Sequence, residues 1–283
     1  MSPRTTRSLI AVAVVAVLVG AGVGLYALWN AAKSSFTADT CTISSYQLDP
    51  DQAAVASTMV GAVTTYRVKL PERATVLVLA AALQESKLRN LAPGEGDRDS
   101  VGVLQQRPSQ GWGGVNYSIA ERTQRLTDVG EATREFVDAL IKVPHWQTLP
   151  LAEAVQDVQI SADGSLYAQH EPEAKAIADA LQGIKPAAIS CSFARPTKVA
   201  STATVATQAG KQLGIDTPAP DGQRVLVPGA RWQTVAWFVA NADRLGIERV
   251  AYDGREWSRS GGWAKSPAAS AAAVTATMYQ LKS

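Results

Sequence analysis

The sequence predicts a mainly α-helical domain followed by a small α+β domain, with one transmembrane helix before both. Three observations support this fold class. Leu9–Trp29 is a run of 21 residues without a charge, apolar residues recur at helical spacing through most of residues 51–181, and strand-like and helix-like segments alternate after residue 223. A chain of 283 residues is long enough for about two domains.

Changes in composition along the chain indicate where the domains and linkers begin and end. Residues 34–50 are mostly polar, and residues 192–222 are rich in Thr, Ala, Pro and Gly, which is typical of linkers. We therefore expect a cytoplasmic tip and transmembrane anchor at 1–33, a linker at 34–50, the helical domain at 51–191, a second linker at 192–222 and the α+β domain at 223–283.

The uncharged run Leu9–Trp29 is long enough to cross a bilayer, which takes about 20 apolar residues. Arg4 and Arg7 precede it, so the N-terminus should stay in the cytoplasm. A cleavable signal peptide is the alternative, although its apolar core is usually about 7 to 15 residues. We favour an uncleaved single-pass anchor in the cell membrane over secretion. Both alternatives place the rest of the chain outside the cytoplasm.

The charge balance argues against nucleic acid binding, and the two cysteines indicate a possible disulfide. The 27 basic and 25 acidic residues nearly balance, and no basic tract indicates nucleic acid binding. Cys41 and Cys191 both lie in the exported part, where an oxidising environment permits a disulfide. Two free thiols are the alternative. No Cys/His cluster indicates a metal, and we expect no cofactor.

The helical domain begins at Asp49-Pro50-Asp51, a plausible helix start. Pro71-Glu72 opens a second helix that ends near Arg89, and residues 92–116 form a long Gly- and Pro-rich loop. Further helices are expected at Ile119–Leu126, Glu131–Val143, Leu151–Ile160 and Glu173–Leu181.

The region after residue 192 has a different pattern. One helix is expected near Val205–Leu213 within the second linker. The α+β domain should then contain a strand at Arg224–Val227, a helix at Trp232–Leu245, a strand at Arg249–Tyr252, a loop to Trp263 and a strand at Val274–Leu281.

Glu85 follows the apolar run Val76–Leu83, at the end of a helix that is otherwise built for burial. Ala81 and Leu88 should share its face. Burial in apolar surroundings raises the pKa of a carboxyl group by disfavouring the anion. Such a carboxylic acid is suited to protonating a leaving oxygen in glycoside cleavage. A solvated helix end is the structural alternative.

The loop after Glu85 carries groups that suit a sugar-binding cleft. Asp97 and Asp99 are carboxylates, Gln105 and Gln106 are amides able to hold N-acetyl groups, and Trp112 offers a flat face for a sugar ring. The structural alternatives are that the aspartates form turns, the glutamines brace the loop and the tryptophan packs against the core.

The strings ALQESKL and GDRDSVGVLQQRPSQGWG, in this order, resemble the lysozyme-like superfamily that includes the soluble lytic transglycosylases. The type common in exported actinobacterial proteins is the most similar. The resemblance covers roughly residues 52–190 and implies a lysozyme-like fold. It also implies that Glu85 is the general acid and then the general base. Ser86 and Gln105 would line the sugar cleft, and Tyr167 would match a tyrosine that closes the cleft near the acid.

The string TVAWFVANADRLGIERVAYDGREWSRSGGW resembles the end of a zinc-peptidase-like domain of exported wall proteins. No histidine occurs after His170, so the sequence predicts a degenerate unit without the metal. Its four tryptophans would form a recognition surface or, as we favour, mostly pack in the core: Trp232, Trp237, Trp257 and Trp263.

Together these features predict an enzyme that cleaves the MurNAc–GlcNAc β-1,4 bond of peptidoglycan. Attack by the muramyl 6-hydroxyl would give a 1,6-anhydro product, and attack by water would give hydrolysis. The alternative is a non-catalytic wall-binding or scaffold protein that retains the cleft. The expected partners are glycan strands and the cytoplasmic membrane through residues 9–29, with other cell-wall proteins as further candidates.

Overall fold

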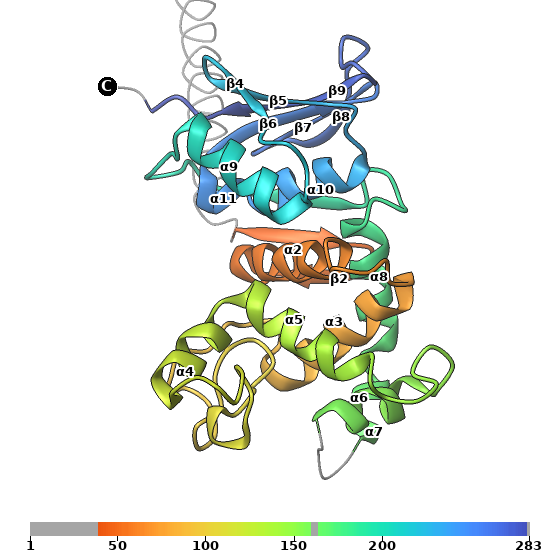
Figure 1. Cartoon of the computed structure of the whole chain (residues 1–283). Coiled ribbons are helices and arrows are strands. Elements are labelled where there is room, and N and C mark those ends of the chain that lie inside the picture. Colours follow the sequence, from red (N-terminus) through yellow and green to blue (C-terminus); the bar gives the residue numbers. More distant parts are fainter. Residues whose placement is uncertain (1–38, 160–163, 282–283) are drawn as a thin grey trace, which may run out of the picture. The chain divides into compact units, whose positions relative to one another are not determined.

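Two buried helices, α2 (Pro50–Thr64) and α3 (Glu72–Ser86), form the centre of the helical region (Figure 1). The structure is a computed structural model, and it describes residues 39–159 and 164–281. The predicted anchor at residues 9–29 lies outside these ranges. Within them, no helix combines the length and apolar character needed to cross a bilayer.

The sequence explains both central helices. Asp49 and Gln52 form a capping box at the start of α2, and Pro50 occupies its first turn. In α3 the apolar residues Leu77–Leu83 are all buried, as the lack of a polar face predicts.

Shorter helices surround this pair. After the 3₁₀ turn Pro108–Gln110 come α4 (Ile119–Thr127), α5 (Val129–Leu140), α6 (Leu151–Gln159), α7 (Ser165–Ala168) and α8 (Glu171–Leu181). The predicted helices agree with these bounds to within a few residues, except that α7 was not predicted and Ile160 is not among the described residues.

A small antiparallel sheet joins the two ends of the helical region. It has the order β2-β1-β3, from β1 (Thr40–Ile43), β2 (Tyr46–Leu48) and β3 (Ile189–Ser192). Residues 40–48 therefore form strands where a polar linker was expected.

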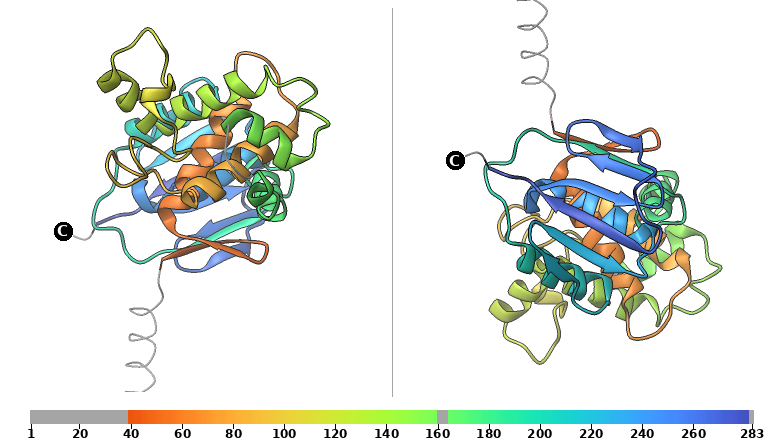
Figure 2. Two further views of the ribbon diagram at one scale, coloured as in Figure 1. Left: turned by 90° about the horizontal axis from the view of Figure 1, so that it is seen from below. Right: turned by 90° about the horizontal axis from the view of Figure 1, so that it is seen from above.

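The C-terminal part is a six-stranded antiparallel sheet of order β4-β5-β9-β6-β7-β8. Its strands are β4 (Ala219–Asp221), β5 (Arg224–Pro228), β6 (Ile247–Tyr252), β7 (Arg255–Ser258), β8 (Gly262–Lys265) and β9 (Ala273–Met278). The right view of Figure 2 looks down on this sheet. The structure is thus mixed, with a helical region followed by a six-stranded antiparallel sheet, and β4, β7 and β8 were not predicted.

Three helices lie between this sheet and α2 in Figure 1: α9 (Thr202–Leu213), α10 (Trp232–Ala240) and α11 (Ala242–Leu245). The predicted helix 232–245 is divided at Asn241, whose side-chain amide donates to the Trp237 carbonyl at 2.8 Å and to Ser57 of α2 at 3.3 Å. Buried residues of the helical and sheet regions form one continuous hydrophobic core.

Tryptophans of the sheet bind main-chain groups of the small sheet. Trp257 donates from Nε1 to the Cys191 carbonyl at 3.0 Å, and Trp263 donates to the Ile189 carbonyl at 2.7 Å. Trp237 and Trp257 are buried, while Trp232 and Trp263 are half-buried with ring centroids 5.8 Å apart. Packing is therefore the role that the structure gives to Trp237 and Trp257.

Arg259 is a second buried residue that connects the C-terminal sheet to neighbouring segments. Its Nε donates to the Ala194 carbonyl at 2.5 Å, Nη1 to the Ala242 carbonyl at 2.8 Å and Nη2 to Asp243 at 2.5 Å. Since its guanidinium is almost completely buried, these acceptors satisfy donors that would otherwise be costly to bury. The residue holds the end of β7 to the segment after β3 and to α11.

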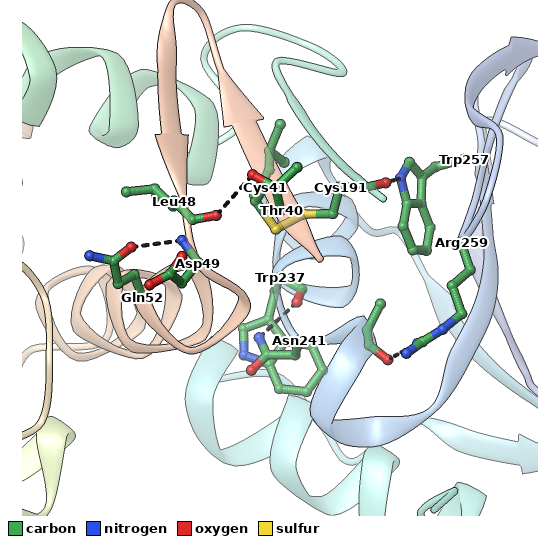
Figure 3. The surroundings of a disulfide bond; sticks show 12 residues. Thr40, Cys41, Leu48, Asp49, Gln52, Cys191, Trp237, Asn241, Trp257 and Arg259 are labelled. Carbon is green, nitrogen blue, oxygen red and sulfur yellow. Dashed lines mark hydrogen bonds between the residues drawn. A yellow bond between two sulfur atoms is a disulfide. The ribbon is translucent and has the colours of Figure 1, made fainter. Parts of the chain in front are cut away.

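The predicted disulfide between Cys41 and Cys191 is confirmed (Figure 3). The two residues are direct partners in the β1–β3 pair, and both are buried. Because disulfides persist in oxidising compartments, the bond indicates an extracytoplasmic environment for this part of the chain.

We predict that the double variant Cys41→Ala/Cys191→Ala loses about 3 to 5 kcal/mol of unfolding free energy. The physical reason is that the bond closes a loop with a sequence separation of 150, which restricts the unfolded chain. Guanidinium denaturation of the oxidised parent, the reduced parent and the variant measures the effect. Equal midpoints for all three would contradict it.

Candidate active site

Glu85 lies in the last turn of α3, where the helix leaves the core. The helix ends because Lys87 and Leu88 adopt left-handed backbone conformations, with φ of 55° and 59°. The N–H groups of these two residues bond to the Leu83 and Ala82 carbonyls at 3.1 Å, and Leu88 is fully buried. The chain thus turns inward after Ser86 and leaves the Glu85 side chain half-buried.

Tyr167 is a direct polar partner of this carboxyl group. Its hydroxyl donates to Glu85 Oε1 at 2.6 Å, and only 2% of the residue is exposed. Tyr167 belongs to the short helix α7, 82 residues further along the chain. The structure therefore brings together two residues that the sequence singled out separately.

Burial raises the pKa of Glu85 above its ordinary value of 4.5. Hydrogen bonds from Tyr167 and Gln159 act in the opposite direction, because they stabilise the anion, but burial is the larger effect. Gln159 also donates to the Leu104 carbonyl at 2.9 Å, which connects the end of α6 to the loop after α3. The carboxyl group therefore keeps its proton to a higher pH than a solvated glutamate.

Gln84, next to Glu85, belongs to a polar group that sequence reasoning missed. Its Oε1 lies 3.0 Å from His170 Nε2 and accepts from Gln169 Nε2 at 3.3 Å. Burial lowers the pKa of His170, which favours the neutral imidazole. The only sequence signal for Gln84 was its place in the string LQESKL.

Ser86 and Gln105 hold the turn that follows α3. Ser86 Oγ donates to the Val103 carbonyl at 2.7 Å and accepts from the Arg89 N–H at 3.1 Å. Gln105 has a positive φ of 47° and donates from Nε2 to the Gly102 carbonyl at 2.8 Å. Both residues therefore brace the loop beside Glu85, and their contact with a sugar stays a prediction.

Gln106 and Trp112 point largely into the protein. Gln106 is 2% exposed and donates to the Ala132 carbonyl at 3.3 Å, so its amide lies inside the helical region. Trp112 is half-buried and packs against the core. These placements favour the structural alternatives considered for both residues, and their contact with a sugar stays a prediction.

Asp97 and Asp99 differ from Glu85 in their surroundings. Asp99 accepts from the Ser109 N–H at 2.9 Å and from Arg107 Nε at 2.7 Å, and these partners hold its pKa well below the ordinary value. Asp97 is exposed, 3.7 Å from Arg98. Within the described residues no hydrogen bond joins either aspartate to Glu85.

In the part of the chain that the structure describes, no group of three His, Cys, Asp or Glu residues is placed to hold a metal ion. A hollow of about 500 Å³ lies beyond the end of α3, and Glu85 does not line it.

Neither protein-family models nor curated proteins give a match to this chain. The resemblance to the lysozyme-like superfamily therefore stays a prediction, which rests on the strings around Glu85 and Gln105.

We predict that Glu85→Gln unfolds at a higher temperature than the parent at pH 7, and that the two melting temperatures converge below pH 4.5. Because burial raises the pKa of Glu85 in the folded protein, the free energy of unfolding of the parent falls as pH rises from the pKa of Glu85 in the unfolded chain to its pKa in the folded protein. The amide carries no charge and still accepts from Tyr167. Calorimetry across pH 4 to 8 measures the two melting temperatures. A variant whose melting temperature does not rise relative to that of the parent between pH 4 and pH 7 would contradict the prediction.

Proposed function

We propose that this protein is an extracytoplasmic enzyme that cleaves the MurNAc–GlcNAc β-1,4 bond of peptidoglycan with Glu85 as its acid. The observation that carries the proposal is the half-buried carboxyl group with a raised pKa, held by the Tyr167 hydroxyl at 2.6 Å. The strings QES and VGVLQQ support it, because they resemble those of lytic transglycosylases and goose-type lysozymes.

The mechanism requires one proton that moves twice. Glu85 protonates the glycosidic oxygen, and the bond between this oxygen and C1 of the muramyl residue breaks. The 6-hydroxyl of the same residue then attacks C1, and its proton returns to Glu85. The products are a 1,6-anhydromuramyl end and a free 4-hydroxyl on GlcNAc. Tyr167 stabilises the anionic carboxylate between the two steps, and no water, metal or cofactor takes part.

The anhydro product is favoured over hydrolysis because neither aspartate of the loop after α3 is placed to act as a base for water. Asp99 is an anion committed to Arg107 and Ser109, and Asp97 lies in solvent. Hydrolysis would need a carboxylate positioned on the opposite side of the sugar from Glu85.

The same proposal places the enzyme at the membrane. Residues 9–29 would anchor it to the cytoplasmic membrane, with everything from residue 39 on the outer side, as the disulfide suggests. Wall glycan is then the polymer within its reach.

The second candidate function is a wall-binding protein without turnover. Two observations favour it. The chain lacks the Tyr-Asn-x-Gly context that usually surrounds the cleft tyrosine, and the zinc-peptidase-like region has no histidine ligand. Such a protein would bind glycan strands and leave them intact.

We predict that Glu85→Gln reduces the rate of glycan cleavage by about 10³-fold, since it removes the transferable proton. The measurement is mass spectrometry of digests of purified peptidoglycan. Anhydro ends indicate the transglycosylase course, and reducing ends indicate hydrolysis.

The matched control is Glu153→Gln, an exposed glutamate on α6, which should cleave at the parent rate. A Glu85→Gln protein as active as the parent would exclude Glu85 as the acid. A parent protein that binds glycan without cutting it would support the wall-binding function instead.

We predict that Tyr167→Phe moves the alkaline limb of the pH profile of kcat/KM to higher pH. The hydroxyl stabilises the anionic Glu85, so its removal raises the pKa of Glu85 further, and the active neutral acid persists to higher pH. The control is Tyr252→Phe, whose hydroxyl bonds to the Ala230 carbonyl in the C-terminal region. A limb that stays in place or moves to lower pH would show that Glu85 is not the titrating acid.

A further inference from the structure

The hollow of about 500 Å³ beyond the end of α3 is a site that the proposed mechanism does not use. It is lined by the start of α2, by the segment that follows α3, and by Arg244 of α11. Ala54, Val55, Leu88 and Val129 supply an apolar part of its wall. The other seven of its eleven lining residues are polar or charged, so a ligand that fits the hollow must carry polar groups as well as apolar ones.

Arg244 gives the hollow an uncompensated positive charge. Its Nε donates to Asn241 Oδ1 and its Nη1 to Gln208 Oε1, both at 2.7 Å, so neutral amides hold the guanidinium. Within the described residues no carboxylate pairs with it. Arg244 reaches solvent, yet surrounding protein lowers its pKa by burial, as expected for a residue in a concave wall. A ligand carboxylate would bond to it strongly.

The opposite charge is also present in the lining. Asp49 pairs with Arg89 at 3.1 Å, whereas Asp51 forms no ion pair with any described residue. The two acidic and two basic residues of the lining balance, which leaves one free cation and one free anion. A ligand with a carboxylate, an ammonium group and small apolar side chains would satisfy all three parts of the wall.

We propose that this hollow binds the short peptide attached to the muramyl residues of the glycan, with a peptide carboxylate on Arg244 and its amine toward Asp51. This inference rests on the proposed function for the nature of the substrate. Such peptides carry methyl side chains, a free carboxylate and, in their third residue, an amine.

The path of the chain sets an upper limit on the distance between the hollow and the residue that carries the acid. Leu88 lines the hollow and follows Glu85 by three residues, so their Cα atoms lie within about 11 Å. A peptide of four residues spans up to about 14 Å. The hollow would thus select glycan that still carries its peptides.

The test measures binding of a synthetic wall tetrapeptide, with a free C-terminal carboxylate and a free amine in its third residue, to the full-length protein by calorimetry. Arg244→Gln should weaken binding about tenfold, because a charge-assisted hydrogen bond is lost. The matched control is Arg249→Gln on β6, an exposed arginine that pairs with Glu256 and should bind as the parent does. A peptide with an amidated C-terminus should bind the parent as weakly as the acid form binds Arg244→Gln.

No binding to the parent at millimolar peptide, or equal binding by both arginine variants, would overturn the inference. So would a loss of affinity of Arg244→Gln for glycan strands stripped of peptides, which would make the hollow a sugar site. Glu85→Gln should bind the peptide as tightly as the parent. Failure of the cleavage assay would therefore be distinguishable from failure of this inference, because peptide binding does not depend on the acid.

Discussion

The burial of α3 up to its last turn is the constraint that produces the chemistry of Glu85. A helix with no polar face must be covered on all sides, and its end is the first place where a polar side chain can reach the surface. Covering a carboxyl group there disfavours its anion, and Tyr167 and Gln159 offset only part of that cost. The result is a carboxylic acid that keeps its proton yet remains half-exposed, a combination that general acid catalysis requires.

The C-terminal sheet contributes to the stability of the helical region as well as to its own. Trp257 and Trp263 donate to carbonyls of β3, which carries Cys191 and pairs with β1. The disulfide fixes the same pair of strands. The C-terminal region therefore has a packing role, and Arg244 of the same region contributes a charged group to a hollow beside α2.

The sequence predicted those elements whose signals are local. Apolar periodicity located α2, α3 and α5, and the strands β5, β6 and β9 followed from short β-branched runs. The strands β1 and β2 were missed because each has at most four residues, and β1 owes its order to β3, nearly 150 residues away. The same limit applies to the site. Glu85 stood out in a string, whereas the contacts of Gln84 and Gln159 depend on how α3, α6 and α8 meet, which no local pattern encodes.

The pKa of Glu85 itself is the most direct test of the claim that this carboxyl group is an acid held in its neutral form. Carbon-13 NMR of labelled glutamate, with Glu85→Gln to assign the resonance, would follow the titration of the side-chain carboxyl. The account predicts a pKa above 4.5, equal to the pH at which wall cleavage declines. A Glu85 that titrates at or below 4.5 while the protein remains folded would contradict it.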